Sequence, residues 1–189
     1  MLWKAPIRLG DPVPPGIHPP SDCDLVLAPV PLGHSLRLAP APDGHVLAPR
    51  FALHHDGRSD PKVAHDGALI LSTESFDGTY LSLTLTLGKE AATSLARHHL
   101  IHLHLTARQS VQRPIFARLS AESGPNTDVL TEELPGEGPE HSQCWDLFHT
   151  GFDALRPGKI WIDVIFAPPP EAQIQIKRLV LLRTPRGGF

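Results

Sequence analysis

The chain has 189 residues, of which 41% are hydrophobic and 20% charged, a composition typical of a folded globular protein rather than a disordered one. The formal net charge of −3 argues against sequence-independent binding of nucleic acid, which needs an excess of lysine and arginine. The sequence opens without the basic segment and apolar stretch of a secretory signal, and no apolar run reaches the length of a membrane span. We therefore expect a cytoplasmic protein without a membrane span, in which Cys23 and Cys144 are free thiols.

Prolines set the first part of the chain apart, because eleven of the 21 prolines lie within the first fifty residues. Proline lacks a backbone N–H, so this part is unsuited to central strands. Only short edge strands fit here, at residues 25–28, 34–38 and 45–51. We predict that residues 1–21 form an extended Pro-rich N-terminal arm, which either packs on the domain or binds a protein partner. A single β-sandwich domain is predicted over residues 22–189.

After a polar loop at residues 54–66, hydrophobic and polar residues alternate with a period of two, as they do in strands with two different faces. The clearest case is residues 80–87, where four leucines alternate with Tyr80, serine and threonine. One short helix is predicted at residues 89–97. The main strands are predicted at residues 68–71, 80–87, 99–107, 114–121, 127–134, 143–149, 159–166 and 172–183. Many short strands separated by Gly/Pro turns predict an all-β fold, an antiparallel two-sheet β-sandwich or jelly roll.

Local catalytic signatures are absent from the sequence. It contains no phosphate-binding glycine loop, no dinucleotide fingerprint, no His-Glu-x-x-His, no nucleophile elbow and no Cys-x-x-Cys. We therefore expect a protein that is not an enzyme and has no cofactor.

Two of the twelve histidines, His102 and His104, are two residues apart in the strand predicted at 99–107, and so share one of its faces. A pair of imidazoles on one surface can bind a metal, and Asp163 is a third ligand if its strand lies alongside. This is the basis of an alternative hypothesis, a metal-dependent enzyme built on these three residues. The other interpretation is that the histidines are polar residues on a half-solvated face, and we expect no tightly bound metal.

On the predicted strands, the positions that face away from the core carry a mixture of aromatic, hydroxyl, imidazole, guanidinium and carboxylate groups. Sugars are recognised by such mixtures, because aromatic rings cover their apolar faces and planar polar groups bind their hydroxyls. Asp163 has two roles open to it, accepting from ligand hydroxyls or orienting Arg118. The alternative is that the large aromatics pack under the N-terminal arm. The predicted ligand-binding residues are Tyr80, His102, His104, Phe116, Arg118, Trp161 and Asp163.

Several segments carry a family resemblance: residues 76–83, 115–119, 124–127 and 159–166, with the Leu-Trp-x-Ala-Pro segment at residues 2–6. With these segments the chain resembles an uncharacterised proteobacterial family of unknown function, over most of its length, and this resemblance implies no known activity. The closing strand–turn–strand pattern is more distantly similar to galactose-binding-like jelly rolls, the fold of many carbohydrate-binding modules. That second resemblance implies the fold more than the ligand.

The leading interpretation is a non-enzymatic binding domain that recognises a glycan or a sugar-containing ligand on one sheet face. The metal-dependent enzyme with His102, His104 and Asp163 is the second hypothesis. The third is a structural or interaction protein that docks through its N-terminal arm.

Overall fold

A computed structural model describes residues 25–31, 50–59, 61–65, 68–87, 92–93, 95–136, 138–168 and 171–186. The predicted N-terminal arm, the strand predicted at residues 34–38 and Cys23 lie outside these residues. The arm and its protein partner therefore stay predictions.

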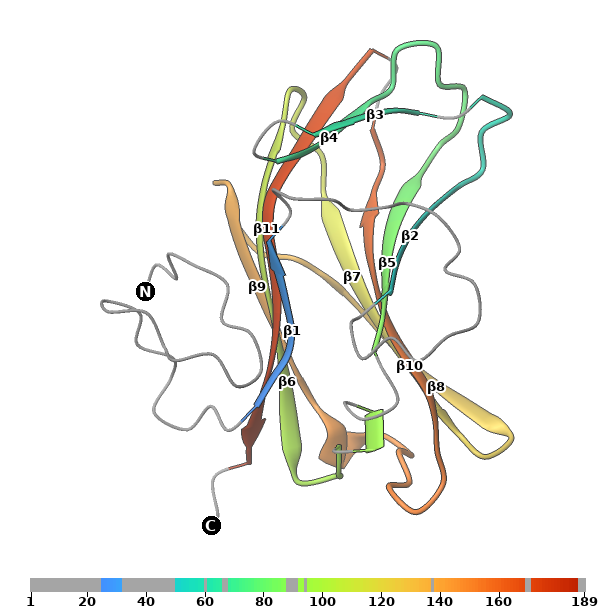
Figure 1. Cartoon of the computed structure of the whole chain (residues 1–189), viewed down its shortest axis with the longest axis vertical. Coiled ribbons are helices and arrows are strands. Elements are labelled where there is room, and N and C mark those ends of the chain that lie inside the picture. The colour runs from blue at the N-terminus through green and yellow to red at the C-terminus, as the bar shows by residue number, and fades with distance from the viewer. Residues whose placement is uncertain are drawn as a thin grey trace.

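Two antiparallel sheets pack face to face in the described part of the chain (Figure 1). One has the strand order β3-β4-β11-β6-β9, with β1 also pairing with β11, and the other has the order β2-β5-β10-β7-β8. This confirms the predicted all-β sandwich. The strands are β1 (Leu25–Pro31), β2 (Arg50–His55), β3 (Lys62–His65), β4 (Leu69–Ser72), β5 (Leu81–Thr86), β6 (His99–Gln109), β7 (Ile115–Ser123), β8 (Asn126–Glu133), β9 (Glu140–Asp146), β10 (Pro157–Phe166) and β11 (Gln173–Pro185).

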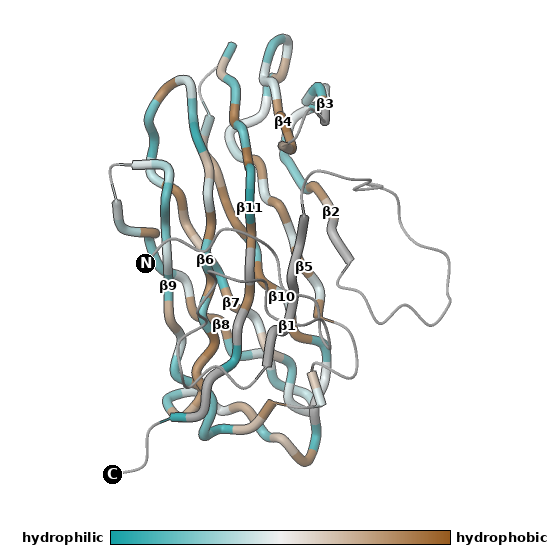
Figure 2. Tube along the Cα trace, turned by 60° about the vertical axis from the view of Figure 1, so that its left-hand side comes forward, coloured by the Kyte–Doolittle hydropathy of each residue, from teal (hydrophilic) through white to brown (hydrophobic). Residues whose placement is uncertain are grey.

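The core lies between the two sheets and is built by the alternation seen in the sequence. Every second residue from Ile101 to Ala107 in β6 and from Ile160 to Phe166 in β10 is buried, while the residues between them are at least partly exposed or polar. Figure 2 shows the same change from hydrophobic to hydrophilic along the strands. Burial of these apolar side chains is the main favourable term that joins the sheets. The opposite face of each sheet is thereby left for other contacts.

The edge strands agree with the proline content of the early chain. β1 contains Pro29 and Pro31 and pairs with one strand, β11. β2 forms an edge of the five-stranded sheet by pairing with β5. The sequence prediction missed β3, because Lys62–His65 is a strand of four residues inside a polar region and shows no clear period of two.

Two predicted boundaries are wrong. The helix predicted at residues 89–97 includes Ala92 and Thr93, but the chain is no longer helical at Leu95, and Arg97 lies in a turn. The strand predicted at residues 143–149 ends earlier, because a 3₁₀ helix, η1, follows β9 at Leu147–His149. Asp146 accepts a hydrogen bond from the Phe148 N–H (3.0 Å) and so caps this helix. None of the helices in the described segments is long and apolar enough to cross a membrane.

Candidate functional site

Four of the seven predicted site residues lie together on the outside of the five-stranded sheet, the surface that we call the outer face. In the pairing of β10 with β7, Asp163 is opposite Arg118, Trp161 is opposite Ser120, and Phe116 is opposite Ile165. Directly paired residues in an antiparallel sheet project to the same side. The neighbouring core residues of β10 are buried on the inner side, so this set faces away from the core.

The centre of the outer face is an ion pair between Arg118 and Asp163. Arg118 Nη2 is 2.8 Å from Asp163 Oδ2, and Arg118 Nε donates to the same oxygen at 2.9 Å. The second carboxylate oxygen accepts from the Thr84 hydroxyl at 2.5 Å, with Ser82 Oγ at 3.5 Å. The Asp163 side chain is 4% exposed and that of Arg118 is 42% exposed. Of the two roles considered for Asp163, these contacts support orienting Arg118, because both carboxylate oxygens are already occupied.

Trp161 and Phe116 are half-buried on either side of this pair. The Lys159 ammonium lies 5.0 Å from the centre of the Trp161 ring, a cation–π contact. The sequence prediction did not include Lys159, although its position two residues before Trp161 on one strand places both on the same face. Arg118 and Lys159 thus give the outer face two cationic groups next to aromatic rings.

Tyr80 lies at one end of the same sheet, immediately before β5, and is 39% exposed. Its backbone N–H donates to Asp56 Oδ1 at 3.2 Å. Trp161 pairs with Thr86, six residues further along β5, so Tyr80 is about 20 Å from Trp161 along the strand direction. Tyr80 is therefore remote from Trp161 and nearer to the Phe116 end of the outer face.

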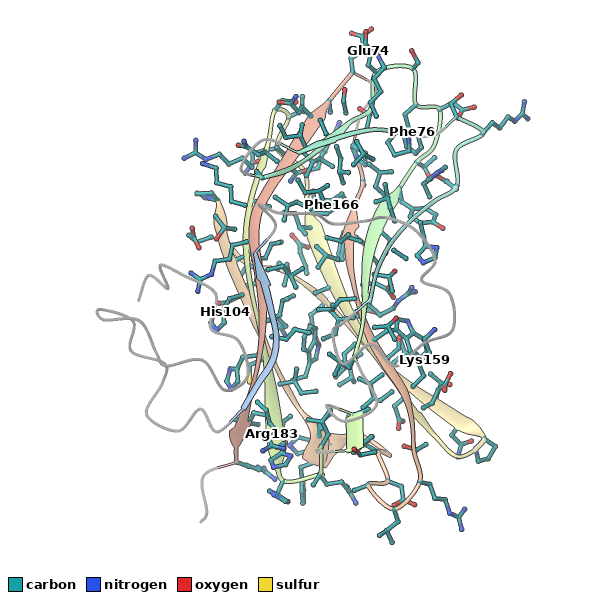
Figure 3. All side chains as sticks on the ribbon, in the orientation of Figure 1. Glu74, Phe76, His104, Lys159, Phe166 and Arg183 are labelled. Atoms are coloured by element: carbon teal, nitrogen blue, oxygen red, sulfur yellow. The ribbon has the colours of Figure 1, made fainter. Side chains whose placement is uncertain are left out.

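His102 and His104 lie on the other sheet. Both are on β6, where they pair with Cys144 and Ser142 of β9, and both project away from the core, so the prediction that they share a face is confirmed. The prediction that they share it with Trp161 is wrong, because β6 and β10 belong to different sheets. Figure 3 shows His104 and Lys159 on opposite sides of the sandwich.

This separation also overturns the hypothesis of a metal site made of His102, His104 and Asp163, since the core lies between the histidines and the carboxylate. No group of three potential ligands that could hold a metal occurs within the described ranges. Cys144 lies beside His102, with its Sγ 4.0 Å from His102 Nε2. Burial, then the charge of His102, lowers the pKa of His104.

The sulfur of Cys144 is a free thiol that is kept protonated. Burial, reinforced by the negative charge of Asp146, raises the pKa of this thiol above its ordinary value. A thiol with a raised pKa is a poor nucleophile at neutral pH, so the pair of Cys144 and His102 does not have the electrostatics of a nucleophilic catalytic site.

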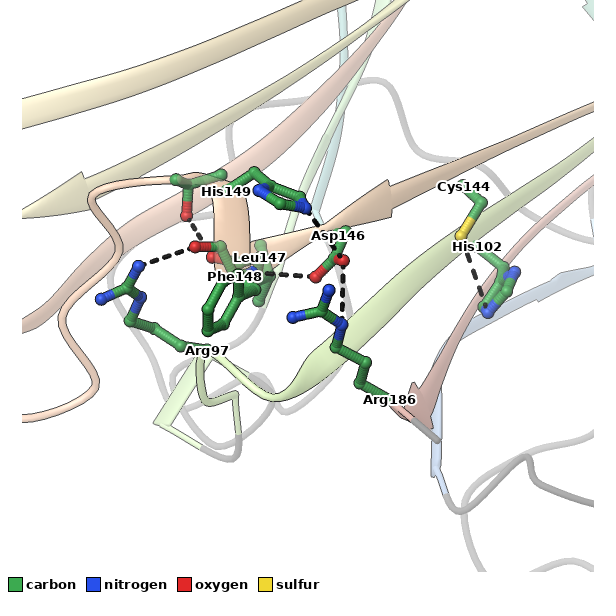
Figure 4. A network of polar contacts seen from close by, with 9 residues as sticks. Arg97, His102, Cys144, Asp146, Leu147, Phe148, His149 and Arg186 are labelled. Atoms are coloured by element: carbon green, nitrogen blue, oxygen red, sulfur yellow. Dashed lines mark hydrogen bonds and ion pairs between the residues drawn. The ribbon is translucent and has the colours of Figure 1, made fainter. Parts of the chain in front are cut away.

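A second aromatic–cation cluster ties the end of β9 to the end of β11 (Figure 4). Arg186 Nε is 3.2 Å from Asp146 Oδ2, and Arg97 Nη2 donates to the Phe148 carbonyl at 2.7 Å. Both guanidinium groups lie over the Phe148 ring, at 4.4 Å for Arg186 and 5.3 Å for Arg97. Since Phe148 is a partly exposed aromatic that is not on the outer face, it is a useful control for Trp161.

Residues 38–189 match the model of a family described as a family of unknown function, DUF6478, which confirms the resemblance seen in the sequence. A comparison with curated protein sequences finds no match. Among solved structures the chain is similar to the enzymatically active domain of bacteriophage CBA120 tailspike protein 4, with 10% identity, a TM-score of 0.47 and coverage of 70% of this chain but 19% of the other. It is also similar to TmCBM61 in complex with β-1,4-galactotriose, with 14% identity, a TM-score of 0.38 and coverage of 70% and 88%. Similarities with such low sequence identity and TM-scores do not identify a ligand of this chain.

Proposed function

The chain belongs to DUF6478, a family of unknown function, and we propose that it is a non-enzymatic binding domain that holds a sugar-containing ligand on its outer face. The observation that carries the proposal is the position of Arg118. Its guanidinium is held by the buried Asp163 at the centre of the outer face, between the half-buried rings of Trp161 and Phe116.

The chemistry of this arrangement suits a saccharide. Aromatic rings pack against the apolar C–H faces of a sugar, and a guanidinium donates to its hydroxyls in a planar fork. Because Asp163 already orients Arg118, the side chain loses little further freedom when a ligand binds. Lys159 adds a second donor at the Trp161 ring. A shallow face of this kind binds weakly, through a few contacts.

A binding role suits this site better than a hydrolytic one. Glycoside hydrolysis commonly needs a carboxyl group that is available to protonate, attack or accept a proton. Asp163 accepts from Arg118 with one oxygen and from Thr84 with the other, and it is buried. Its carboxylate is thus engaged in holding the site together.

The cytoplasmic location stays a prediction. In that compartment a sugar nucleotide is a suitable ligand, because Arg118 can bind a phosphate as well as hydroxyls. A ligand screen should therefore include nucleotide sugars beside free glycans.

The test is a glycan and nucleotide-sugar array probed with the parent protein and with Trp161→Ala and Phe148→Ala. Both variants remove a partly exposed aromatic that contacts a cation, but only Trp161 lies on the outer face. We expect Trp161→Ala to lose saccharide binding while its melting temperature stays within a few degrees of the parent, and Phe148→Ala to keep binding. A parent that binds no saccharide, or a Trp161→Ala variant that binds as well as the parent, would overturn the proposal.

Arg118→Lys provides an independent test. Lysine keeps the positive charge but loses the planar fork that makes two contacts with Asp163 Oδ2. If Arg118 acts through its geometry, this variant binds the saccharide at least tenfold more weakly in isothermal titration. Unchanged affinity would mean that charge alone is needed.

A further inference from the structure

A shallow, open cavity of about 640 Å³ lies at the end of the sandwich where β7 begins and β8 ends. Its volume is within the range of small-molecule sites. The cavity adjoins the outer face, because Glu133 lines the cavity and pairs in register with Phe116 of the outer face. Gln112, Arg113, Gly136 and His141 also line the cavity.

The walls of the cavity are held in place by a side-chain hydrogen bond on one side and by backbone conformation on the other. Gln109 Nε2 donates to the Arg113 carbonyl at 2.7 Å, which fixes the loop before β7. On the other side, Gly136 has a φ of +122°, and a Cβ at this position would lie 3.2 Å from the Glu140 carbonyl oxygen. Such a conformation is open to glycine and strained for other residues. The cavity is thus formed before any ligand arrives, which lowers the entropic penalty of binding.

The polar groups around the cavity can both donate and accept. His141 is 7% exposed, and its Nδ1 is 3.3 Å from the Pro135 carbonyl oxygen. When Nδ1 donates to that carbonyl, Nε2 of the neutral ring is an acceptor. Gln112 and Arg113 are exposed at the cavity, where the Arg113 guanidinium is a donor, and Glu133 is an exposed acceptor.

These groups favour an uncharged ligand. Arg113 and Glu133 carry opposite charges at one small cavity, so a ligand with a single net charge meets one group of like sign. Hydroxyl groups, by contrast, donate and accept at once and satisfy both kinds of partner.

We propose that this cavity binds the uncharged terminal residue of the saccharide whose remaining residues lie on the outer face. This inference rests on the proposed function. Phe116 lies beside the cavity and is four residues from Ser120, the partner of Trp161, so the rings are separated by about 13 Å along the strand direction. The outer face then binds the internal part of an extended chain, and the cavity selects its end.

The test uses single sugars, which can fill the cavity without spanning the outer face. The amide signals of Gly136 and Gln112 are followed by NMR during titration with the methyl glycosides of glucose, galactose and mannose. Glucuronate is the anionic probe, and glycine is a zwitterionic probe whose two charges could each meet a group of opposite sign. We expect at least one neutral glycoside to shift these signals with a saturable curve. We expect Arg113→Ala and Gln112→Ala to raise its Kd at least fivefold. Val111→Ala is the matched control, since Val111 is 44% exposed in the same loop and does not line the cavity.

Trp161→Ala separates the two proposals, because it should weaken binding of an oligosaccharide through the outer face, whereas Arg113→Ala and Gln112→Ala should weaken binding at the cavity. If an oligosaccharide binds through Trp161 while Arg113→Ala and Gln112→Ala have no effect, the proposed function stands and the cavity inference is overturned. Binding of glucuronate or glycine in place of the neutral glycosides overturns the cavity inference as well. If neither the oligosaccharide nor any glycoside binds, both proposals fail.

Discussion

Asp56 and Asp77 each accept hydrogen bonds from the backbone of the loop that carries the other. Asp56 Oδ1 accepts from the Thr79 N–H at 2.7 Å, and Asp77 Oδ1 accepts from the Arg58 N–H at 2.7 Å. The reciprocal contacts join the end of β2 to the segment that enters β5. The first of these loops has closely spaced oxygen groups, as calcium loops do, but the two carboxylates are used to fix turns.

These contacts predict a dependence of stability on acid pH. The pKa of Asp56 is lowered from 3.8, chiefly by the hydrogen bond from the Thr79 hydroxyl, and the pKa of Asp77 is lowered by hydrogen bonds from the Ser59 and Arg58 N–H groups. A carboxyl group whose pKa is depressed on folding stabilises the protein above its unfolded pKa, and this contribution disappears as the pH falls through the folded value.

We therefore expect Asp56→Ala to be less stable than the parent at pH 7, with the difference shrinking below about pH 3.8. Urea denaturation at pH 7 and pH 3 measures it. A stability difference of the same size at both pH values would show that the ionised form of Asp56 is not what matters.

The same two loops approach so closely that glycine is needed in both. A Cβ on Gly57 would lie 2.5 Å from Phe76 Cε2 and 2.9 Å from the Gly78 nitrogen, and the second of these atoms cannot move aside. Gly57→Ala should destabilise the protein by about 1–3 kcal/mol, as overpacking does. Gly138→Ala is the control, because a Cβ there meets nothing within 4 Å. Equal thermal stability of the two variants would contradict this account.

The ion pair on the outer face makes a separate prediction about stability. Asp163→Ala removes the partner of Arg118 and of the Thr84 hydroxyl. We expect the free energy of unfolding to fall by about 2 kcal/mol. This is less than for a fully buried pair, because Arg118 is 42% exposed and the released guanidinium can be solvated. Thr131→Ala, opposite Arg118 on the edge strand β8, should change the free energy of unfolding little. Comparable losses in the two variants would refute a special role for Asp163.

Cys144 should react slowly with alkylating reagents although it is exposed. The residue as a whole is exposed, but partial burial of its sulfur and the charge of Asp146 raise the pKa of the thiol, so little thiolate is present at pH 7. In a Cys23→Ser background, the rate with iodoacetamide should keep rising up to and beyond pH 9. Asp146→Asn should shift this profile to lower pH, and a profile that levels off near pH 7 would disagree with the structure.

The regular strands were predictable from sequence because each one buries alternate residues. Hydropathy alone shows which residues face the core in residues 81–87 and 160–166. The same rule identified Trp161, Asp163, Phe116 and Arg118 as outward-facing, and the structure places all four on one sheet.

What the sequence could not supply is the pairing between strands. A period of two tells which side of its own strand a residue is on, but it does not tell which sheet the strand joins. His102 and Trp161 follow the same rule and are nevertheless on opposite sides of the core. Lys159 lies in the strand predicted at residues 159–166, two residues before Trp161, so the same rule of alternation places it on the outer face.

The central strand of each sheet is made last. β10 occupies the middle of the five-stranded sheet and β11 the middle of the six-stranded sheet, and they are the final two strands in the chain. While the protein is being synthesised, β5 and β7 have no β10 between them, and β4 and β6 have no β11. Neither sheet can therefore close on a nascent chain until β10 and β11 have emerged from the ribosome. The hydrophobic faces of the earlier strands stay open to misfolding or to chaperones until then.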